Sequence, residues 1–95
     1  MSGESHPTPN DVVLAVEVSN TTLRYDLIRK ARLYGAAGVQ EYWVVDTDQR
    51  RVVVHREPRA EGYASVTEWR EGESIAPLVF QQNIVLVSDL FPQTK

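Results

Sequence analysis

Two charged side chains stand inside apolar stretches of this sequence. Glu17 interrupts a β-branched run that begins at Val12 and ends at Val18. Lys30 falls on the apolar side of the helix expected after that run. An ionised carboxylate in a buried strand is costly unless a cation or a metal ion pairs with it. Since Glu17 also lies near the carboxyl end of its strand, where open α/β sheets bind ligands, it is a candidate site residue.

The run around Glu17 has two interpretations. It is apolar at nearly every position, which is typical of a central strand covered on both faces. Alternatively, it is an edge strand with one face in water, where Glu17 is simply solvated. On that face Glu17 would lie beside Val13, Ala15 and Ser19.

The next segment predicts a helix from about Leu23 to Ala36 that ends at Gly38. Asp26 and Lys30 both lie within its apolar sector. Their spacing also fits an ordinary i, i+4 ion pair on a helix surface. That pair alone leaves unexplained why both charges are on the side that meets the sheet. We therefore expect the Lys30 amine within roughly 6 Å of the Glu17 carboxylate.

The remaining segments predict a mixed sheet. A strand at residues 39–46 completes a βαβ unit, so it should be parallel to the first strand. Residues 50–57 and 63–69 then form an antiparallel hairpin, with His55 on its surface and Trp43 of the preceding strand in the core. Short extended pieces at 77–80 and 84–87 and a helical turn at 89–91 complete the prediction of one α/β domain.

Composition narrows the class of protein. The chain has 95 residues, 42% of them hydrophobic, which suits one small globular domain. It contains no run long enough for a membrane span. It has no cysteine, which excludes disulfides and thiol catalysis and agrees with an expected cytoplasmic location.

Charge is unevenly distributed along the chain. Residues 24–59 hold eight basic and five acidic residues, whereas the segments on either side are each acidic overall. A basic middle permits a DNA-binding face. Ordinary solvated charge explains the same distribution equally well.

Several segments together resemble the Uma-two family of restriction-endonuclease-like proteins, within the PD-(D/E)xK nuclease superfamily. The resemblance begins with the strand that holds Glu17 and with the helix that holds Asp26, Lys30 and Tyr34. It continues through Gly-Val-Gln-Glu-Tyr-Trp-Val-Val-Asp at residues 38–46, the most specific segment, and through the carboxyl end near residues 72–91. It covers roughly residues 6–92.

The resemblance implies a metal-dependent DNA endonuclease with a restriction-endonuclease-like sheet. By position, Glu17 is a metal ligand and catalytic residue, and the carbonyl of Val18 is a backbone ligand. Lys30 takes the part of the motif lysine, whose usual place two residues after Glu17 is occupied by Ser19. Asp26, Ser19 and Tyr34 are supporting residues. Mg²⁺ or Mn²⁺ is the implied cofactor, since hard cations prefer oxygen ligands.

One family feature is missing. The first acidic ligand of the family comes from an upstream Pro-Asp strand, which residues 1–10 do not contain. Asp11 cannot replace it, because a straight strand would hold it on the order of 20 Å from Glu17. We therefore expect an unstructured leader at residues 1–10 and a truncated domain at residues 11–92, the carboxyl-terminal half of the fold.

This departure leaves two function classes open. One is a metal-dependent endonuclease, inactive or weak by itself. The other is a non-catalytic DNA-binding or protein-interaction module built on the same scaffold. A missing upstream strand would also expose the strand edge from Val12 to Val18, which has few features that discourage pairing, so we expect a homodimer through that edge.

Overall fold

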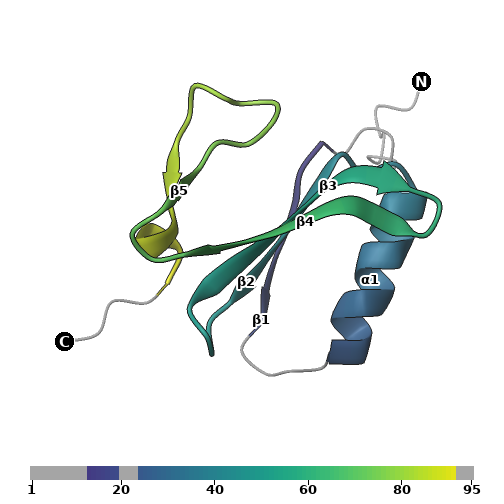
Figure 1. Ribbon diagram of the computed structural model, residues 1–95, viewed down its shortest axis with the longest axis horizontal. Coiled ribbons are helices and arrows are strands. Elements are labelled where there is room, and N and C mark those ends of the chain that lie inside the picture. The colour runs from purple at the N-terminus through teal and green to yellow at the C-terminus, as the bar shows by residue number, and fades with distance from the viewer. Residues whose placement is uncertain (1–12, 20–23, 92–95) are drawn as a thin grey trace, which may run out of the picture.

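The computed structural model describes residues 13–19 and 24–91, with only the backbone described for residues 24–26. A strand and a helix are followed by a series of strands (Figure 1). The elements are β1 (Ala15–Ser19), α1 (Arg24–Ala36), β2 (Glu41–Asp46), β3 (Arg51–Arg59), β4 (Gly62–Arg70), β5 (Ser74–Ile75), β6 (Val85–Leu86) and the 3₁₀ helix η2 (Val87–Leu90).

The first four strands form one mixed sheet in the order β1-β2-β3-β4. β1 and β2 are parallel and are connected through α1, whereas β3 and β4 follow as antiparallel strands. The predicted α/β class is confirmed: a βαβ unit followed by antiparallel strands is consistent with a restriction-endonuclease-like fold. Within the described part of the chain, no helix is long and apolar enough to cross a membrane.

Helix α1 ends as its sequence predicts. Gly38 adopts a positive φ of 86°, and the N–H groups of Gly38 and Val39 donate to the carbonyls of Gly35 and Tyr34. This is a Schellman motif, in which glycine supplies the left-handed residue that ends the helix. Gly35 then lies against the backbone of Gly62, because a Cβ at Gly35 would be 2.0 Å from the Gly62 carbonyl oxygen. The end of α1 is therefore packed closely onto the β3–β4 hairpin.

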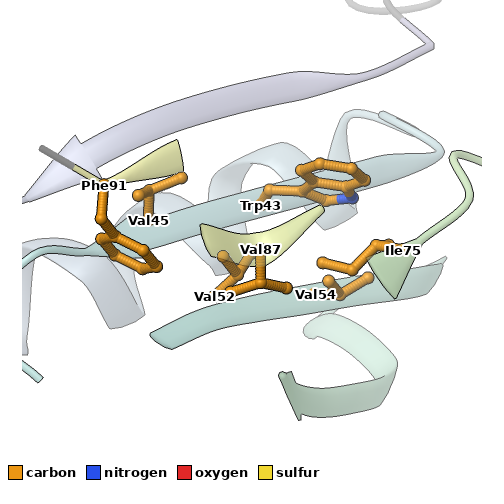
Figure 2. Close-up of a cluster of buried hydrophobic side chains, with 7 residues drawn as sticks. All are labelled: Trp43, Val45, Val52, Val54, Ile75, Val87 and Phe91. Carbon is orange, nitrogen blue, oxygen red and sulfur yellow. The ribbon is translucent and has the colours of Figure 1, made fainter. Parts of the chain in front are cut away.

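The two faces of the sheet are covered differently. α1 lies along one side of the sheet, and the segment that contains β5 lies on the other (Figure 1). Figure 2 shows the core on this second side, where side chains of β2 and β3 pack against the carboxyl-terminal segment. The buried cluster comprises Trp43, Val45, Val52, Val54, Ile75, Val87 and Phe91, which confirms Trp43 as a core residue.

The interpretation of the first strand as central and covered on both faces is wrong for the described residues. β1 is at one edge of the sheet, and its side chains alternate between half-buried and exposed positions. Val16 and Val18 are 51% and 66% exposed, whereas Glu17 points to the helix side. The strand buried along its length is β2, because it has a strand on either side and a covered face above and below.

The carboxyl-terminal segment is attached to the sheet by a buried acid. Glu41 is fully buried, and its carboxylate accepts hydrogen bonds from Trp43 Nε1, Arg56 Nε and the Leu78 amide. Arg56 also donates to the carbonyl of Ala76. The predicted extended piece at residues 77–80 is instead a turn, closed by a bond from the Phe80 amide to the Pro77 carbonyl.

Candidate active site

Glu17 and Lys30 meet between β1 and α1. Lys30 Nζ lies 2.6 Å from Glu17 Oε2, so the expected convergence of the two side chains is confirmed. Glu17 is the third residue of β1, and Lys30 reaches it from the middle of α1. The Glu17 side chain is 27% exposed and that of Lys30 is 42% exposed. The pair is therefore open to solvent and accessible to a ligand.

A third residue, Tyr42, completes the contacts of Glu17 and was not singled out from the sequence. Its hydroxyl donates to Glu17 Oε1 at 2.9 Å, and its side chain is fully buried. Burial, and then the hydrogen bond to Glu17, raise the pKa of Tyr42 well above its ordinary value. Tyr42 therefore remains a proton donor to the carboxylate. The available signal was register, because parallel pairing sets Tyr42 opposite Ala15, on the same face as Glu17.

Aromatic rings surround Tyr42 and fix its position. Tyr34, which was expected as a supporting residue, meets its ring edge-on with centroids 4.9 Å apart. His55 and Tyr63 contact the same ring. The expectation of a surface His55 is wrong, since its Nδ1 donates to the Tyr42 carbonyl at 3.0 Å and burial lowers its pKa. Tyr63 donates to the carbonyl of Val39, and burial raises its pKa to about 12.

The backbone carbonyls of Val18 and Ser19, two residues expected at the site, point to opposite sides of β1. The carbonyl of Ser19 accepts from the amide and hydroxyl of Thr47, so it points towards β2. Because carbonyls alternate along a strand, that of Val18 points to the outer edge of the sheet. Val18 therefore presents an oxygen next to the Glu17 position, as a backbone ligand would. The Ser19 carbonyl, in contrast, is directed inward to β2.

Asp26 belongs to α1, but its side chain, like the whole of residues 1–12, lies outside the described residues.

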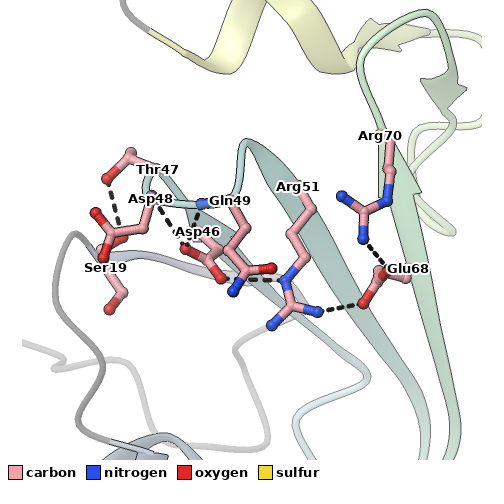
Figure 3. A network of polar contacts seen from close by, with 8 residues as sticks. All are labelled: Ser19, Asp46, Thr47, Asp48, Gln49, Arg51, Glu68 and Arg70. Carbon is pink, nitrogen blue, oxygen red and sulfur yellow. Dashed lines mark hydrogen bonds and ion pairs between the residues drawn. The ribbon is translucent and has the colours of Figure 1, made fainter.

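A second acid near the carboxyl ends of the parallel strands is already engaged. Asp46 ends β2 opposite Ser19, and Figure 3 shows it accepting bonds from the Asp48 and Gln49 amides and from Arg51. Arg51 continues the network to Glu68, which also accepts from Arg70. Asp46 thus holds the β2–β3 turn.

A hollow of about 300 Å³ lies between α1 and strands β2 to β4. Its walls are mostly apolar, with Leu27 and Ala31 on the helix and Val53 and Val66 on the sheet. Neither Glu17 nor Lys30 lines it, so the acid–lysine pair is a separate feature.

The described residues fit a divalent cation only in part. Glu17 supplies one carboxylate, and both of its oxygens already accept hydrogen bonds from protein donors. Among the described side chains, which are those of residues 13–19 and 27–91, no three His, Cys, Asp or Glu gather as metal ligands would. Mg²⁺ in proteins takes near-octahedral oxygen ligation, with carboxylates providing charge.

Taken together, the architecture is that of a mixed α/β, restriction-endonuclease-like domain with an acid–lysine pair on its first strand and helix. The chain belongs to the Uma2 family, whose model, described as "Putative restriction endonuclease", matches residues 2–88. No curated protein matches the chain.

Proposed function

We propose that this chain is a DNA-endonuclease scaffold of the PD-(D/E)xK superfamily that carries part of a metal-dependent site. The observation that supports this most strongly is the 2.6 Å contact between Glu17 and Lys30, at the positions where the family resemblance expects a metal ligand and the motif lysine. In this proposal the chain corresponds to the carboxyl-terminal half of the fold. The site becomes complete when a second carboxylate joins Glu17.

Each residue has a role that its geometry supports. Glu17 and the outward carbonyl of Val18 would hold Mg²⁺ or Mn²⁺, a group that polarises a phosphate and lowers the pKa of a bound water. Lys30, in contact with Glu17, is placed to orient water or stabilise negative charge that develops on the phosphate. Tyr42 holds the carboxylate from the buried side.

DNA is the proposed substrate on grounds of charge as well as family. α1 presents Arg29 and Arg32 as exposed residues on the helix that carries Lys30. Exposed cations attract the phosphate backbone without reading sequence. Arg29 and Arg32 are therefore expected to contribute to binding in a salt-dependent way, whereas Arg51 and Arg56 are already paired with acids.

Plasmid cleavage tests this proposal. Supercoiled DNA is incubated with the purified chain and Mg²⁺ or Mn²⁺, alongside Glu17→Gln and Lys30→Met. We expect slow or absent nicking by the native chain, with any activity lost in both variants, because one carboxylate is too few for a firm cation site. Robust cleavage that Glu17→Gln abolishes would show that the site is already complete, and cleavage that neither variant changes would refute the assigned residues.

The second candidate is a non-catalytic module in which Glu17 has a structural part. It is favoured by one observation: both carboxylate oxygens already accept bonds, which tie β1 to α1 and β2. Chemical denaturation separates the two. A solvent-open ion pair contributes no more than about 1 kcal/mol, so under the nuclease proposal Lys30→Met barely changes stability. A much larger loss in Lys30→Met would favour the structural part.

A further inference from the structure

The outer edge of β1 is not paired with any described strand. Among the described residues, β1 pairs with β2 on one side and with no strand on the other. The opposite edge, β4, carries Glu68 and Arg70, charges that discourage strand pairing. β1 has the sequence Ala-Val-Glu-Val-Ser, whose only charge, Glu17, is matched by Lys30. Of the two edges of this sheet, β1 is therefore the one open to another strand.

The hydrogen-bonding groups on this edge can be assigned to residues. Because the Ser19 carbonyl faces Thr47 on the β2 side, Ser19, Glu17 and Ala15 direct their backbone groups to β2. Val16 and Val18 therefore direct their N–H and C=O groups outward. Their side chains are 51% and 66% exposed, on the face opposite Glu17. The edge thus offers two complete donor–acceptor sets with apolar side chains between them.

Access to this edge is not blocked by the helix. α1 packs mainly over β3 and β4 and touches the hairpin at Gly62, while Lys30 extends across to Glu17. The helix therefore leaves room for a strand to approach β1 in the plane of the sheet.

We propose that a second copy of this chain pairs with β1 in antiparallel orientation, about a two-fold axis at Glu17. In this register Val16 of each copy bonds with Val18 of the other, so all four outward sets are used. Glu17 then faces Glu17 of the second copy as a non-hydrogen-bonded pair, with Cα atoms about 4.5 Å apart. The two side chains lie on the same, helix-covered side of a continuous sheet.

Charge is balanced in this arrangement. Two carboxylates directly opposite one another are unfavourable by themselves. Here each has its own Lys30 amine at 2.6 Å, so the row of four groups carries no net charge. The second copy also brings the second carboxylate that the nuclease proposal requires, and the Val18 carbonyl is then used in strand pairing instead of serving as a backbone ligand. The need for a second carboxylate is the one point that rests on the proposed function. Cross-linking and sedimentation report on strand pairing whether or not the chain cleaves DNA.

Cross-linking tests the register. The chain has no cysteine, so Glu17→Cys, Val16→Cys and Val18→Cys each introduce a single thiol. Under mild oxidation at micromolar concentration we expect the Glu17→Cys disulfide dimer to form several-fold faster than the other two, because only this residue faces itself at a disulfide-compatible distance. Faster linkage through Val16→Cys or Val18→Cys would overturn the register.

A matched pair of lysine variants tests the edge itself. Val18 on β1 and Val66 on β4 are both exposed valines on edge strands, 66% and 56% accessible. In sedimentation experiments Val18→Lys should be monomeric and Val66→Lys dimeric like the native chain, with circular dichroism confirming that both are folded. A native chain that is monomeric would refute the proposal, whether residues 1–12 or nothing covers this edge. A dimer that is lost only in Val66→Lys would also refute it.

Discussion

The Glu17 carboxylate is held in place before any ligand arrives. One oxygen receives the Lys30 amine and the other receives the Tyr42 hydroxyl, and these donors come from different elements. Tyr42 is buried and ring-packed, whereas Lys30 is 42% exposed on a flexible side chain. Tyr42 thus sets the position of the carboxylate, and Lys30 is the partner that would move if the proposed cation or phosphate binds.

Removing the tyrosine hydroxyl should reveal this positioning. In Tyr42→Phe the ring packing remains but Glu17 loses a charge-assisted bond, so we expect the free energy of unfolding to fall by about 1.5–3 kcal/mol. Tyr63→Phe is the matched control, since it loses a bond to the neutral Val39 carbonyl and should cost only about 0.5–1.5 kcal/mol. Equal losses in urea denaturation would show that the contact with Glu17 is not special.

His55 gives the fold a defined response to mild acid. Burial lowers its pKa from 6.5, so the unfolded chain takes up a proton at a higher pH than the folded chain. The His55 contribution is fully present above pH 6.5 and is lost as the pH falls through the lowered value. The free energy of unfolding should therefore decrease as the pH falls below about 6.5. In His55→Gln this slope should flatten, and an unchanged slope would assign it to another group.

Among the elements, β2 links the site to the core. Its alternate residues serve two faces: Tyr42 positions Glu17, while Glu41 and Trp43 anchor the carboxyl-terminal segment. The family segment Glu-Tyr-Trp, specific as a motif, is thus explained by structure, because each side chain has a buried contact.

Breaking the Glu41 anchor should be expensive. Glu41→Gln leaves Arg56 without its carboxylate and weakens the contact to the Leu78 amide, so we expect a loss of about 3–5 kcal/mol in stability. The control is Glu71→Gln, whose partner Arg50 is on the surface, and it should change stability little. If the two variants unfold at the same denaturant concentration, the anchor is not a major support of the fold.

Local sequence patterns predicted most of the helices and strands, but not which elements lie beside one another in the fold. The helix end followed from Gly38, and the parallel pairing followed from the βαβ order. The burial of β1 did not, because an apolar run does not reveal which strands lie beside it. Tyr42 was missed for a similar reason, since its contact with Glu17 joins residues on different strands and depends on register.

At the scale of the whole molecule, the candidate site lies next to the strand edge that is proposed to pair with a second copy. The described residues provide one carboxylate, one lysine and an open strand edge next to them. A second strand on that edge brings additional groups to Glu17, whichever chain it comes from. If the proposed function and the proposed strand pairing both hold, activity should follow occupancy of this edge.

Metal binding by the isolated chain tests this account most directly. Mn²⁺ is titrated by calorimetry into the chain kept monomeric by Val18→Lys, with the Val18→Lys, Glu17→Gln double variant as the control. The account predicts no binding at sub-millimolar Mn²⁺, because a single carboxylate with both oxygens engaged is an incomplete ligand set. Sub-millimolar binding by the monomer that is lost on Glu17→Gln would contradict it, since the site would then be complete within one chain.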